Sequence, residues 1–269
     1  MRRLNPSEPA WCPGCGNYSI LPTLDEAIDE VGIDRHRLVL VSGIGQAAKL
    51  PHYTKANVFN GLHGRALPPA TAIKLANHEL EVLITSGDGD MYGEGGNHFI
   101  HAIRRNIGVK CFVHNNQVYG LTKGQASPTS DEGMETKIQT HGVMARPLNP
   151  LALAIVEGAS FVARSCAVTR DHLKEMMMAA LKHDEGFVLL DILQHCPSFN
   201  RRNTAKWYRD HVKPVGDDHD PTDVHAALDL AMTWGEEIPI GVIYRSDRPS
   251  LEGRHPVLQE GTLVSRYEG

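Results

Sequence analysis

Several features are scarce in this 269-residue sequence, and each scarcity excludes a class of function. No apolar run approaches the ~20 residues that a membrane helix requires, so we expect no membrane partner. Basic residues gather only in adjacent arginine pairs and the net charge is −5, so we expect no nucleic-acid partner. Residues 4–17 are too polar for a secretory signal, and we therefore expect a cytoplasmic protein.

Cysteine is also scarce, with five residues in the whole chain. Cys12 and Cys15 form a Cys-x-x-Cys pair, and the odd total argues against a disulfide framework. In an intracellular protein such a pair indicates metal or redox chemistry.

The sequence does contain a regular alternation of short apolar runs and amphipathic stretches. Strands are expected at 38–41, 82–85, 109–114, 161–163, 187–192 and 240–244. Helices are expected at 18–31, 66–78, 95–106, 171–182 and 221–234, with Asp171 and Asp220 as N-caps of the last two. This alternation predicts an α/β fold, a mostly parallel sheet flanked by helices on both faces. Residues 124–150 and 197–220 lack periodicity and are expected to form functional loops.

Glycine, aspartate and asparagine follow two of the expected strands, at Gly87–Asp90 and at Asn115-Asn116. Carboxyl ends of parallel strands share one edge of a sheet, so the two motifs are expected to meet there. Glycines let a backbone approach a diphosphate, and the amides of the following helix start favour an anion. Asp88, Asn116 and the Val118 carbonyl offer the oxygen ligands that Mg²⁺ prefers. Either fragment alone is compatible with a simple turn, but the pair favours a thiamine diphosphate–Mg²⁺ site.

Further motifs in this order resemble one family, the β subunits of the 2-oxoacid:ferredoxin oxidoreductases. The matching segments are 11–16 (WCPGCG), 43–45 (GIG), 61–66 (GLHGRA), 74–77 (KLAN), 87–106, 115–130 (NNQVYGLTKGQASPTS) and 196–197 (CP). The resemblance spans about residues 10–200. It implies the diphosphate-binding type of thiamine diphosphate fold over 1–200, with a C-terminal extension, 201–269, packed on that domain or on a partner subunit.

The resemblance also implies roles for individual residues. Mg²⁺ would be held by Asp88, Asn116 and Val118, and His63 and Arg65 would be the catalytic side chains. The residues expected to contact the cofactor are Gly45, His63, Gly87, Asp88, Gly89, Asp90, Asn116, Tyr119, Gly120, Leu121 and Thr122. For His63 the alternative is a hydrogen-bonded core histidine, and for Arg65 a surface ion pair.

The substrate is expected to be a 2-oxoacid, with 2-oxoglutarate favoured over pyruvate. Lys49, Arg65, Leu121 and Lys123 are the expected substrate contacts, since members that act on 2-oxoglutarate or on many 2-oxoacids resemble this sequence there. A lysine ammonium could pair with a distal carboxylate. The alternative for Lys123 is a solvated loop lysine.

An iron–sulfur cluster, [4Fe–4S] in the family, is expected on Cys12, Cys15 and Cys196. The sequence departs from the family at the remaining ligand, because Gln46 stands where a cysteine is expected and four thiolates are usual. The cluster could have a non-cysteine ligand at this position, keep one iron with an open position, or lack that iron. Alternatively, Cys111 or Cys166 could replace the missing thiolate. Both of those cysteines lie in apolar strands, which favours a structural role. Zn²⁺ with His195 as fourth ligand, or no metal, are further alternatives.

The implied reaction is oxidative decarboxylation of a 2-oxoacid to acyl-CoA and CO₂, with electrons passed through the cluster to ferredoxin. Only the diphosphate half of a thiamine site is present, which implies an α or fused γα partner subunit rather than a self-sufficient homodimer. One alternative is a non-redox thiamine-dependent decarboxylase or lyase subunit without a functional cluster. The other is a non-catalytic metal-binding or assembly module.

Overall fold

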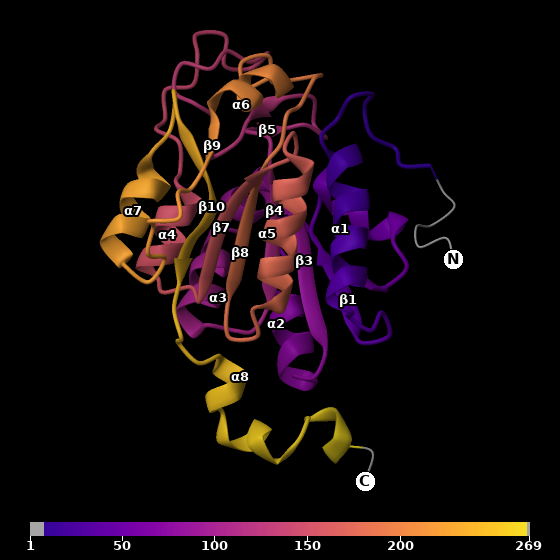
Figure 1. The fold of residues 1–269 in the computed structure, drawn as a ribbon. Coiled ribbons are helices and arrows are strands. Elements are labelled where there is room, and N and C mark those ends of the chain that lie inside the picture. Colours follow the sequence, from indigo (N-terminus) through magenta and orange to yellow (C-terminus); the bar gives the residue numbers. More distant parts are fainter. Residues whose placement is uncertain (1–7, 268–269) are drawn as a thin grey trace.

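The computed structural model describes residues 8–267, which fold around one eight-stranded sheet (Figure 1). The strand order is β2-β1-β3-β4-β8-β7-β10-β9. The strands are β1 (Leu38–Ser42), β2 (Asn57–Asn60), β3 (Glu81–Gly87), β4 (Lys110–Asn115), β7 (Phe161–Cys166), β8 (Val188–Leu193), β9 (Val212–Pro214) and β10 (Ile238–Arg245). A separate hairpin pairs β5 (Val118–Tyr119) with β6 (Gln125–Ala126).

The sheet is parallel except at one pair, where β10 runs antiparallel to β7. The register places Gly87 of β3 opposite His114 of β4 and Asn115 of β4 opposite Leu193 of β8. The carboxyl ends of β3, β4 and β8 therefore lie side by side, at the upper edge of the sheet in Figure 1.

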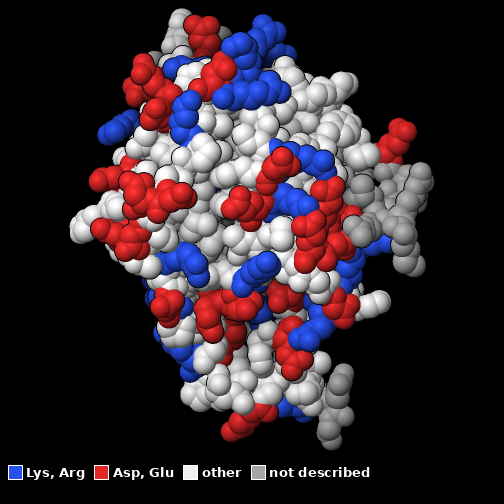
Figure 2. Space-filling model, viewed as in Figure 1, with Lys and Arg blue, Asp and Glu red and all other residues white. Residues whose placement is uncertain are grey.

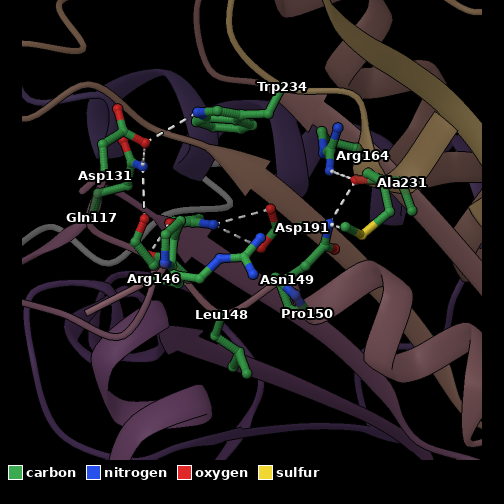
Figure 3. A pocket seen from close by; sticks show the side chains of 14 residues that line it. Gln117, Asp131, Arg146, Leu148, Asn149, Pro150, Arg164, Asp191, Ala231 and Trp234 are labelled. Carbon is green, nitrogen blue, oxygen red and sulfur yellow. Dashed lines mark hydrogen bonds between the residues drawn. The ribbon is translucent and has the colours of Figure 1, made fainter. Parts of the chain in front are cut away.

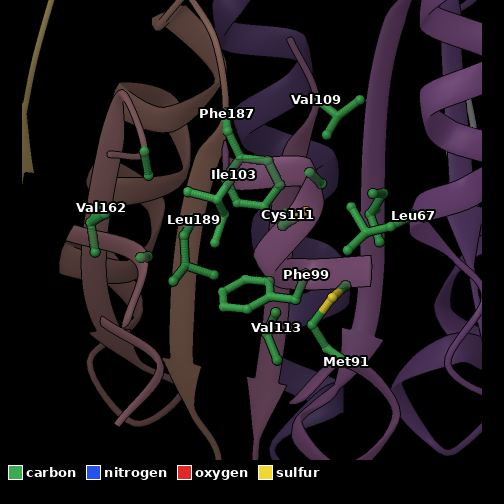
Figure 4. Close-up of a cluster of buried hydrophobic side chains, with 14 of the residues drawn as sticks. Leu67, Met91, Phe99, Ile103, Val109, Cys111, Val113, Val162, Phe187 and Leu189 are labelled. Carbon is green, nitrogen blue, oxygen red and sulfur yellow. The ribbon is translucent and has the colours of Figure 1, made fainter. Parts of the chain in front are cut away.

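Helices cover both faces of the sheet. On one face α1 (Asn17–Val31) and α5 (Arg170–Lys182) pack together over a buried apolar cluster. On the other face, shown in part in Figure 4, a second cluster is covered by α2 (Leu67–Ala76), α3 (Gly96–Arg105), α4 (Pro150–Val156) and α7 (Val224–Met232). The shorter elements are α6 (Ala205–His211), α8 (Leu251–Arg254), η1 (Ala47–Tyr53), η2 (Gly89–Glu94), η3 (Pro256–Glu260) and η4 (Val264–Arg266).

Charged side chains of both signs are scattered over the face of the molecule seen in Figure 2, with no extended region of one sign. A nucleic-acid-binding surface would show a basic stripe or patch. This face shows no such stripe or patch.

The α/β fold class predicted from the alternation is confirmed, but two predicted helix caps are wrong. Helix α5 begins one residue before Asp171, with Thr169 at the cap position. Helix α7 is capped by Asp223, whose side chain accepts hydrogen bonds from the amides of His225 and Ala226. A capping side chain is chosen by the backbone geometry of the preceding turn, which the residue type alone does not fix.

The last quarter of the chain is part of the same sheet. Residues beyond 200 contribute β9 and β10, and α7 packs on β10 and α4. The division of the chain near residue 200 stays a prediction. Among residues 8–267, no helix combines the length and the apolar character that crossing a bilayer requires.

Candidate active site

A cleft lies at the carboxyl edge of the sheet, where the segments after β1, β3 and β4 meet. All eleven residues expected to contact the cofactor line it: Gly45, His63, Gly87, Asp88, Gly89, Asp90, Asn116, Tyr119, Gly120, Leu121 and Thr122. Ile44, Gln46, Ala47 and Val118 complete the lining. The two sequence motifs that were expected to meet therefore share one cleft.

Asp88 is the buried acid of the cleft, with 1% of its surface exposed. Its Oδ2 accepts hydrogen bonds from the hydroxyls of Ser127 and Thr129, the latter at 2.7 Å. Its Oδ1 accepts only a long bond, 3.4 Å, from the Asn116 amide. Burial raises the pKa of Asp88 to about 6, against the lowering effect of these hydrogen bonds. One oxygen is thus held in place, and the other has a free lone pair in a cleft where a cation would stabilise it.

The turn after β4, residues 115–118, is called the metal loop here. Gln117 takes a left-handed conformation there, with φ of 61°, which is uncommon for a residue other than glycine. Its side-chain amide donates to the Thr129 carbonyl at 2.7 Å and to Asp131 at 3.1 Å, and its own carbonyl accepts from Ser130. These bonds hold a conformation that brings the Asn116 side chain and Val118 into the cleft beside Asp88.

Asp90 is buried and accepts hydrogen bonds on both oxygens. Oδ1 accepts from the Ile44 amide at 3.0 Å and the Gly64 amide at 2.7 Å, and lies 2.6 Å from His63 Nδ1. Oδ2 accepts from the Ser86 hydroxyl at 2.6 Å. The carboxylate therefore ties together the loops after β1, β2 and β3 and orients the His63 ring.

Tyr119 and Glu94 form the wall of the cleft next to His63. The Tyr119 hydroxyl donates to Glu94 at 3.0 Å, and His63 Nε2 lies 3.5 Å from the same carboxylate. Burial and the Glu94 charge raise the pKa of Tyr119 well above its ordinary value. The ring of Tyr119 covers Gly89 so closely that a Cβ at Gly89 would lie 2.3 Å from it. Glycine is therefore required at Gly89 by close packing.

Three of the four residues expected to bind substrate lie outside the lining of the cleft. Lys49 donates from Nζ to the Ala10 carbonyl, and Arg65 contacts the carbonyls of Gly64 and Glu94. Lys123 is exposed, has φ of 83°, and lines a different hollow. Leu121 does line the cleft.

The three cysteines expected to bind a cluster lie near the cleft edge. Cys12, Cys15 and Cys196 are close enough to influence one another electrostatically, and burial raises the pKa of Cys15 to about 11 and also raises that of Cys196. Gln194 donates to the Cys15 sulfur at 3.1 Å. Among the described residues, no group of three or more His, Cys, Asp or Glu side chains is placed to hold a single metal ion.

Gln46 links the cysteine segment to the cleft. Its carbonyl accepts from the indole of Trp11, the residue before Cys12, at 2.8 Å. Its side-chain oxygen is buried and has no hydrogen-bond partner within the part of the chain that the structure describes. The two other cysteines, Cys111 and Cys166, are fully buried in β4 and β7, and burial raises the pKa of each thiol.

Several residues of the site carry no strong sequence signal. Ser127 and Thr129, which fix Asp88, lie in the loop 124–150 that its lack of periodicity had marked as functional. Glu94 acts through contacts with residues 25 and 31 positions away in the chain, and such contacts leave no local sequence pattern. Gln117 acts through its left-handed backbone, which its residue type does not predict.

Comparison with known proteins identifies the family to which the chain belongs. The family described as "Thiamine pyrophosphate enzyme, C-terminal TPP binding domain" matches residues 41–192, more than half of the chain. The family of the C-terminal part of the pyruvate ferredoxin oxidoreductase β chain matches residues 196–260. A 2-oxoacid:ferredoxin oxidoreductase subunit beta from a Sulfolobus species is 42% identical, over 94% of this chain and 88% of that protein. The chain belongs to the β subunits of the 2-oxoacid:ferredoxin oxidoreductases.

Other members of the family show the same likeness. The β subunit from Saccharolobus solfataricus is 44% identical over 88% of this chain and 82% of its own length. The 2-oxoglutarate oxidoreductase subunit KorB of Mycobacterium tuberculosis is 46% identical over 72% of this chain and 52% of its own. A solved structure of 2-oxoglutarate:ferredoxin oxidoreductase from Magnetococcus marinus, described with 2-oxoglutarate, coenzyme A and succinyl-CoA bound, superposes with a TM-score of 0.91 at 35% identity, covering 99% of this chain and 90% of that one. The family resemblance read from the motifs is thereby confirmed.

Proposed function

We propose that this chain holds the diphosphate end of thiamine diphosphate through Mg²⁺, in an enzyme that converts a 2-oxoacid and coenzyme A to acyl-CoA and CO₂. The observation that carries the proposal is the buried carboxylate of Asp88, held on one oxygen and open on the other, in a cleft it shares with Asn116 and Val118. A carboxylate, an amide oxygen and a main-chain carbonyl are hard oxygen donors of the kind that Mg²⁺ binds together with phosphates.

The cleft residues have separable tasks. When bound, thiamine diphosphate supplies the carbon nucleophile that attacks the keto carbon and stores the electrons left after CO₂ departs. Asp88, Asn116 and the Val118 carbonyl would hold Mg²⁺ against the diphosphate. Asp90 would act as a positioning residue, since its oxygens already accept hydrogen bonds from protein donors and fix His63. His63 faces the cleft from a loop and would orient the reacting groups.

We assign 2-oxoglutarate as the favoured substrate, because relatives named for 2-oxoglutarate are among the most similar. Lys49, Arg65 and Lys123 lie outside the cleft lining, so we expect them to contribute at its mouth or through a partner subunit. The test is to compare kcat/KM for 2-oxoglutarate and pyruvate in the complete enzyme, with coenzyme A and an artificial electron acceptor. A clear preference for pyruvate would contradict the assignment.

We also propose an iron–sulfur cluster on Cys12, Cys15 and Cys196, with electrons passed from it to ferredoxin. Two contacts that bring the three segments together support it: the Cys15 amide donates to the Cys12 carbonyl at 3.0 Å, and Gln194, two residues before Cys196, donates to the Cys15 sulfur at 3.1 Å. Gln46 supplies an unpartnered amide oxygen where the family has a fourth thiolate. An iron opposite Gln46 would therefore be weakly held, and the cluster would lose it readily.

Anaerobic purification with the partner subunit tests this cluster. Iron and acid-labile sulfide analysis, with electron paramagnetic resonance, should show a three-iron signal after mild oxidation that Gln46→Cys abolishes. Absence of both iron and sulfide would contradict the cluster and favour the alternative function, a non-redox thiamine-dependent decarboxylase or lyase, to which the Gln46 departure points.

A partner subunit follows from the incompleteness of the site. The cleft would hold a diphosphate and a metal, while Ile44 and Leu121 of its lining are exposed apolar side chains, as is Leu62, the neighbour of His63 in the chain. We propose that this mouth is covered, and the site completed, by an α or fused γα subunit. Copurification of the two chains checks this. An isolated chain that catalyses the reaction unaided would contradict it.

A further inference from the structure

The metal loop makes contacts on the side that faces away from the cleft. Gln117 lines a second hollow of the molecule, together with Asp131 and Trp234 (Figure 3). Asn116 and Val118, its neighbours in the chain, line the cleft. Successive residues of the loop therefore face the two hollows in turn, and a contact made in one hollow can set the position of groups in the other.

The carboxylate of Asp131 is the central acceptor in this second hollow. Asp131 is 8% exposed, and its Oδ1 accepts from the Gln117 side-chain amide at 3.1 Å and from the Trp234 indole at 3.0 Å. Its Oδ2 accepts from Asn203 at 3.2 Å and lies 3.5 Å from Arg202. One carboxylate thus connects the metal loop to two parts of the chain beyond residue 200, the turn before α6 and the end of α7.

The backbone of Gln117 needs such support. Its φ of 61° is left-handed, and a residue other than glycine keeps this conformation only where the surrounding structure holds it. The side-chain nitrogen of Gln117 donates to the Thr129 carbonyl and to Asp131. Loss of the Asp131 acceptor would leave one of these two side-chain restraints in place.

The oxygens proposed to face Mg²⁺ lie on either side of Gln117. The Asn116 side-chain nitrogen donates to Gln194 at 3.3 Å, and its oxygen accepts from the Val118 amide at 3.0 Å. The Asn116 carbonyl accepts from the side chain of Asn200 at 3.1 Å. With Asn116 fixed in this way, a rotation of the Gln117 backbone would move the Val118 carbonyl away from the Asn116 side chain.

We propose that Asp131 and Trp234 are positioning residues of the Mg²⁺ site. Trp234 holds the Asp131 carboxylate, and that carboxylate holds Gln117. Gln117 in turn sets the separation of the Asn116 and Val118 oxygens. The inference rests on the thiamine diphosphate–Mg²⁺ function proposed above. It makes the segment after residue 200 part of the metal site, although that segment contributes no lining residue to the cleft.

Titration calorimetry with Mg²⁺ at saturating thiamine diphosphate, on the chain purified with its partner subunit, tests the proposal. In Asp131→Asn an accepting oxygen becomes a donating nitrogen with hydrogen-bond donors around it. We expect Mg²⁺ affinity to fall about tenfold, as is typical when a residue that orients a metal ligand is changed.

Two tryptophans provide a matched pair for the same titration. Trp234→Phe keeps an aromatic ring and the net charge but loses the N–H group that Asp131 accepts, and should weaken Mg²⁺ about threefold. Trp207→Phe is the control, because its indole nitrogen donates to no residue among 8–267 although the ring lies 6.3 Å from that of Trp234. It should leave Mg²⁺ affinity unchanged.

A double substitution separates position from charge, since Asp131→Asn also removes a negative charge. Gln117→Gly removes the side chain that Asp131 holds and lets the backbone take its left-handed conformation freely. A residue that acts through Gln117 has no further effect once that side chain is gone, so Asp131→Asn should change nothing in the Gln117→Gly background. An equal loss in both backgrounds would show an effect of charge alone and would overturn the positioning role.

The remaining outcomes distinguish this inference from the function on which it rests. Natural Mg²⁺ affinity in Asp131→Asn, with weak affinity in Asp88→Asn, would overturn the inference and leave the proposed function standing. Thiamine diphosphate binding that needs no Mg²⁺ in the natural protein would overturn both. Thermal unfolding without Mg²⁺ monitors the fold, and a lower melting temperature with natural Mg²⁺ affinity would show a purely structural role. Should Asp131→Asn fail to fold, the comparison of Trp234→Phe with Trp207→Phe decides.

Discussion

The two aspartates of the Gly-Asp-Gly-Asp motif differ in what surrounds their carboxylates. Asp90 accepts bonds from two backbone amides, His63 and Ser86, so its oxygens are used within the protein. Asp88 has one oxygen in the cleft that accepts only a long bond, 3.4 Å, from the Asn116 amide. The same residue type, two positions apart, therefore serves structure in one case and, as we propose, ligand binding in the other.

Replacement of Asp90 by Asn should destabilise the fold. The Asn side chain has a donating nitrogen where Asp90 has an accepting oxygen, so that nitrogen would face hydrogen-bond donors of the protein. Buried donors would lose their acceptor, and we expect the free energy of unfolding to fall by about 2–3 kcal/mol. Urea denaturation monitored by circular dichroism measures it. Asp229→Asn, at an exposed position of α7, is the control and should change stability by less than about 0.5 kcal/mol. An Asp90 variant as stable as the control would contradict the positioning role.

Close packing at Gly89 can be tested by alanine substitution, with a nearby glycine, Gly96, as the control. Gly89→Ala places a methyl group 2.3 Å from the Tyr119 ring, which must move, and overpacking of this kind costs about 1–3 kcal/mol. Gly96→Ala, at the start of α3, meets nothing within 4 Å and should be neutral or stabilising. Thermal unfolding of both variants measures the difference, and equal melting temperatures would rule out the close packing.

At the scale of elements, the end of α3 joins three parts of the chain. Asn106 ends α3 with φ of 57°, in the left-handed region. Its side-chain nitrogen donates to Ser160 and to the carbonyls of Arg248 and Pro249, and its oxygen accepts from the Phe187 amide. One buried side chain thus ties α3 to the start of β8 and to the C-terminal segment.

Two substitutions at Asn106 separate backbone conformation from side-chain bonding. Asn106→Gly keeps the left-handed backbone but loses the hydrogen bonds, while Asn106→Ala loses both. We expect both to destabilise, with Ala worse than Gly by about 1 kcal/mol. Chemical denaturation of the two proteins measures the gap, and an alanine variant as stable as the glycine variant would show that the conformation carries no cost.

The long periodic elements could be predicted from sequence, but several short ones could not. Five helices and six strands were expected within a few residues of their observed ends, because their apolar spacing is set by the faces they bury. Strand β2 was missed because its residues, Asn57–Asn60, are exposed and carry no apolar pattern. Helix α4 begins inside the loop expected to end at residue 150, and its seven residues are too few for a periodic signal.

At the scale of the whole molecule, the segment after residue 200 completes the sheet. Strand β10 lies between β7 and β9, and its backbone partners β7 through residues 161–164. Because its pairing is antiparallel, it departs from the parallel pattern that the alternation of strands and helices predicts. The sequence offers no rule for this exception, since the preceding crossover, not the strand itself, sets its direction.

A chain that ends at residue 200 should therefore fail to fold cooperatively. Removal of residues 201–269 would expose the edge of β7 that pairs with β10. It would also remove α7 and β10 from the apolar cluster that contains Ala227, Ala231 and Ile243. Urea denaturation of the truncated chain measures this, with the full chain as control. A sharp transition like that of the full chain would show that 1–200 is a self-sufficient domain.

Much of the candidate site could be found from sequence, because its glycines and oxygen donors follow strands whose ends must meet. The hydroxyls of Ser127 and Thr129 and the carboxylate of Glu94 could not, since they depend on how loops return to the sheet edge. Lys49 and Lys123, the expected substrate contacts, do not directly follow a strand of the sheet, so the topology did not fix their positions. Both residues lie outside the cleft.

The central claim is that Asp88 binds the metal of a thiamine diphosphate site. Titration calorimetry of the purified protein and its partner subunit with thiamine diphosphate, with and without Mg²⁺, tests it most directly. We expect Mg²⁺-dependent binding that Asp88→Asn weakens by about 100-fold or more, while the melting temperature of the variant without cofactor stays near that of the natural protein. Binding that is independent of Mg²⁺, or that Asp88→Asn leaves unchanged in a folded protein, would contradict the claim.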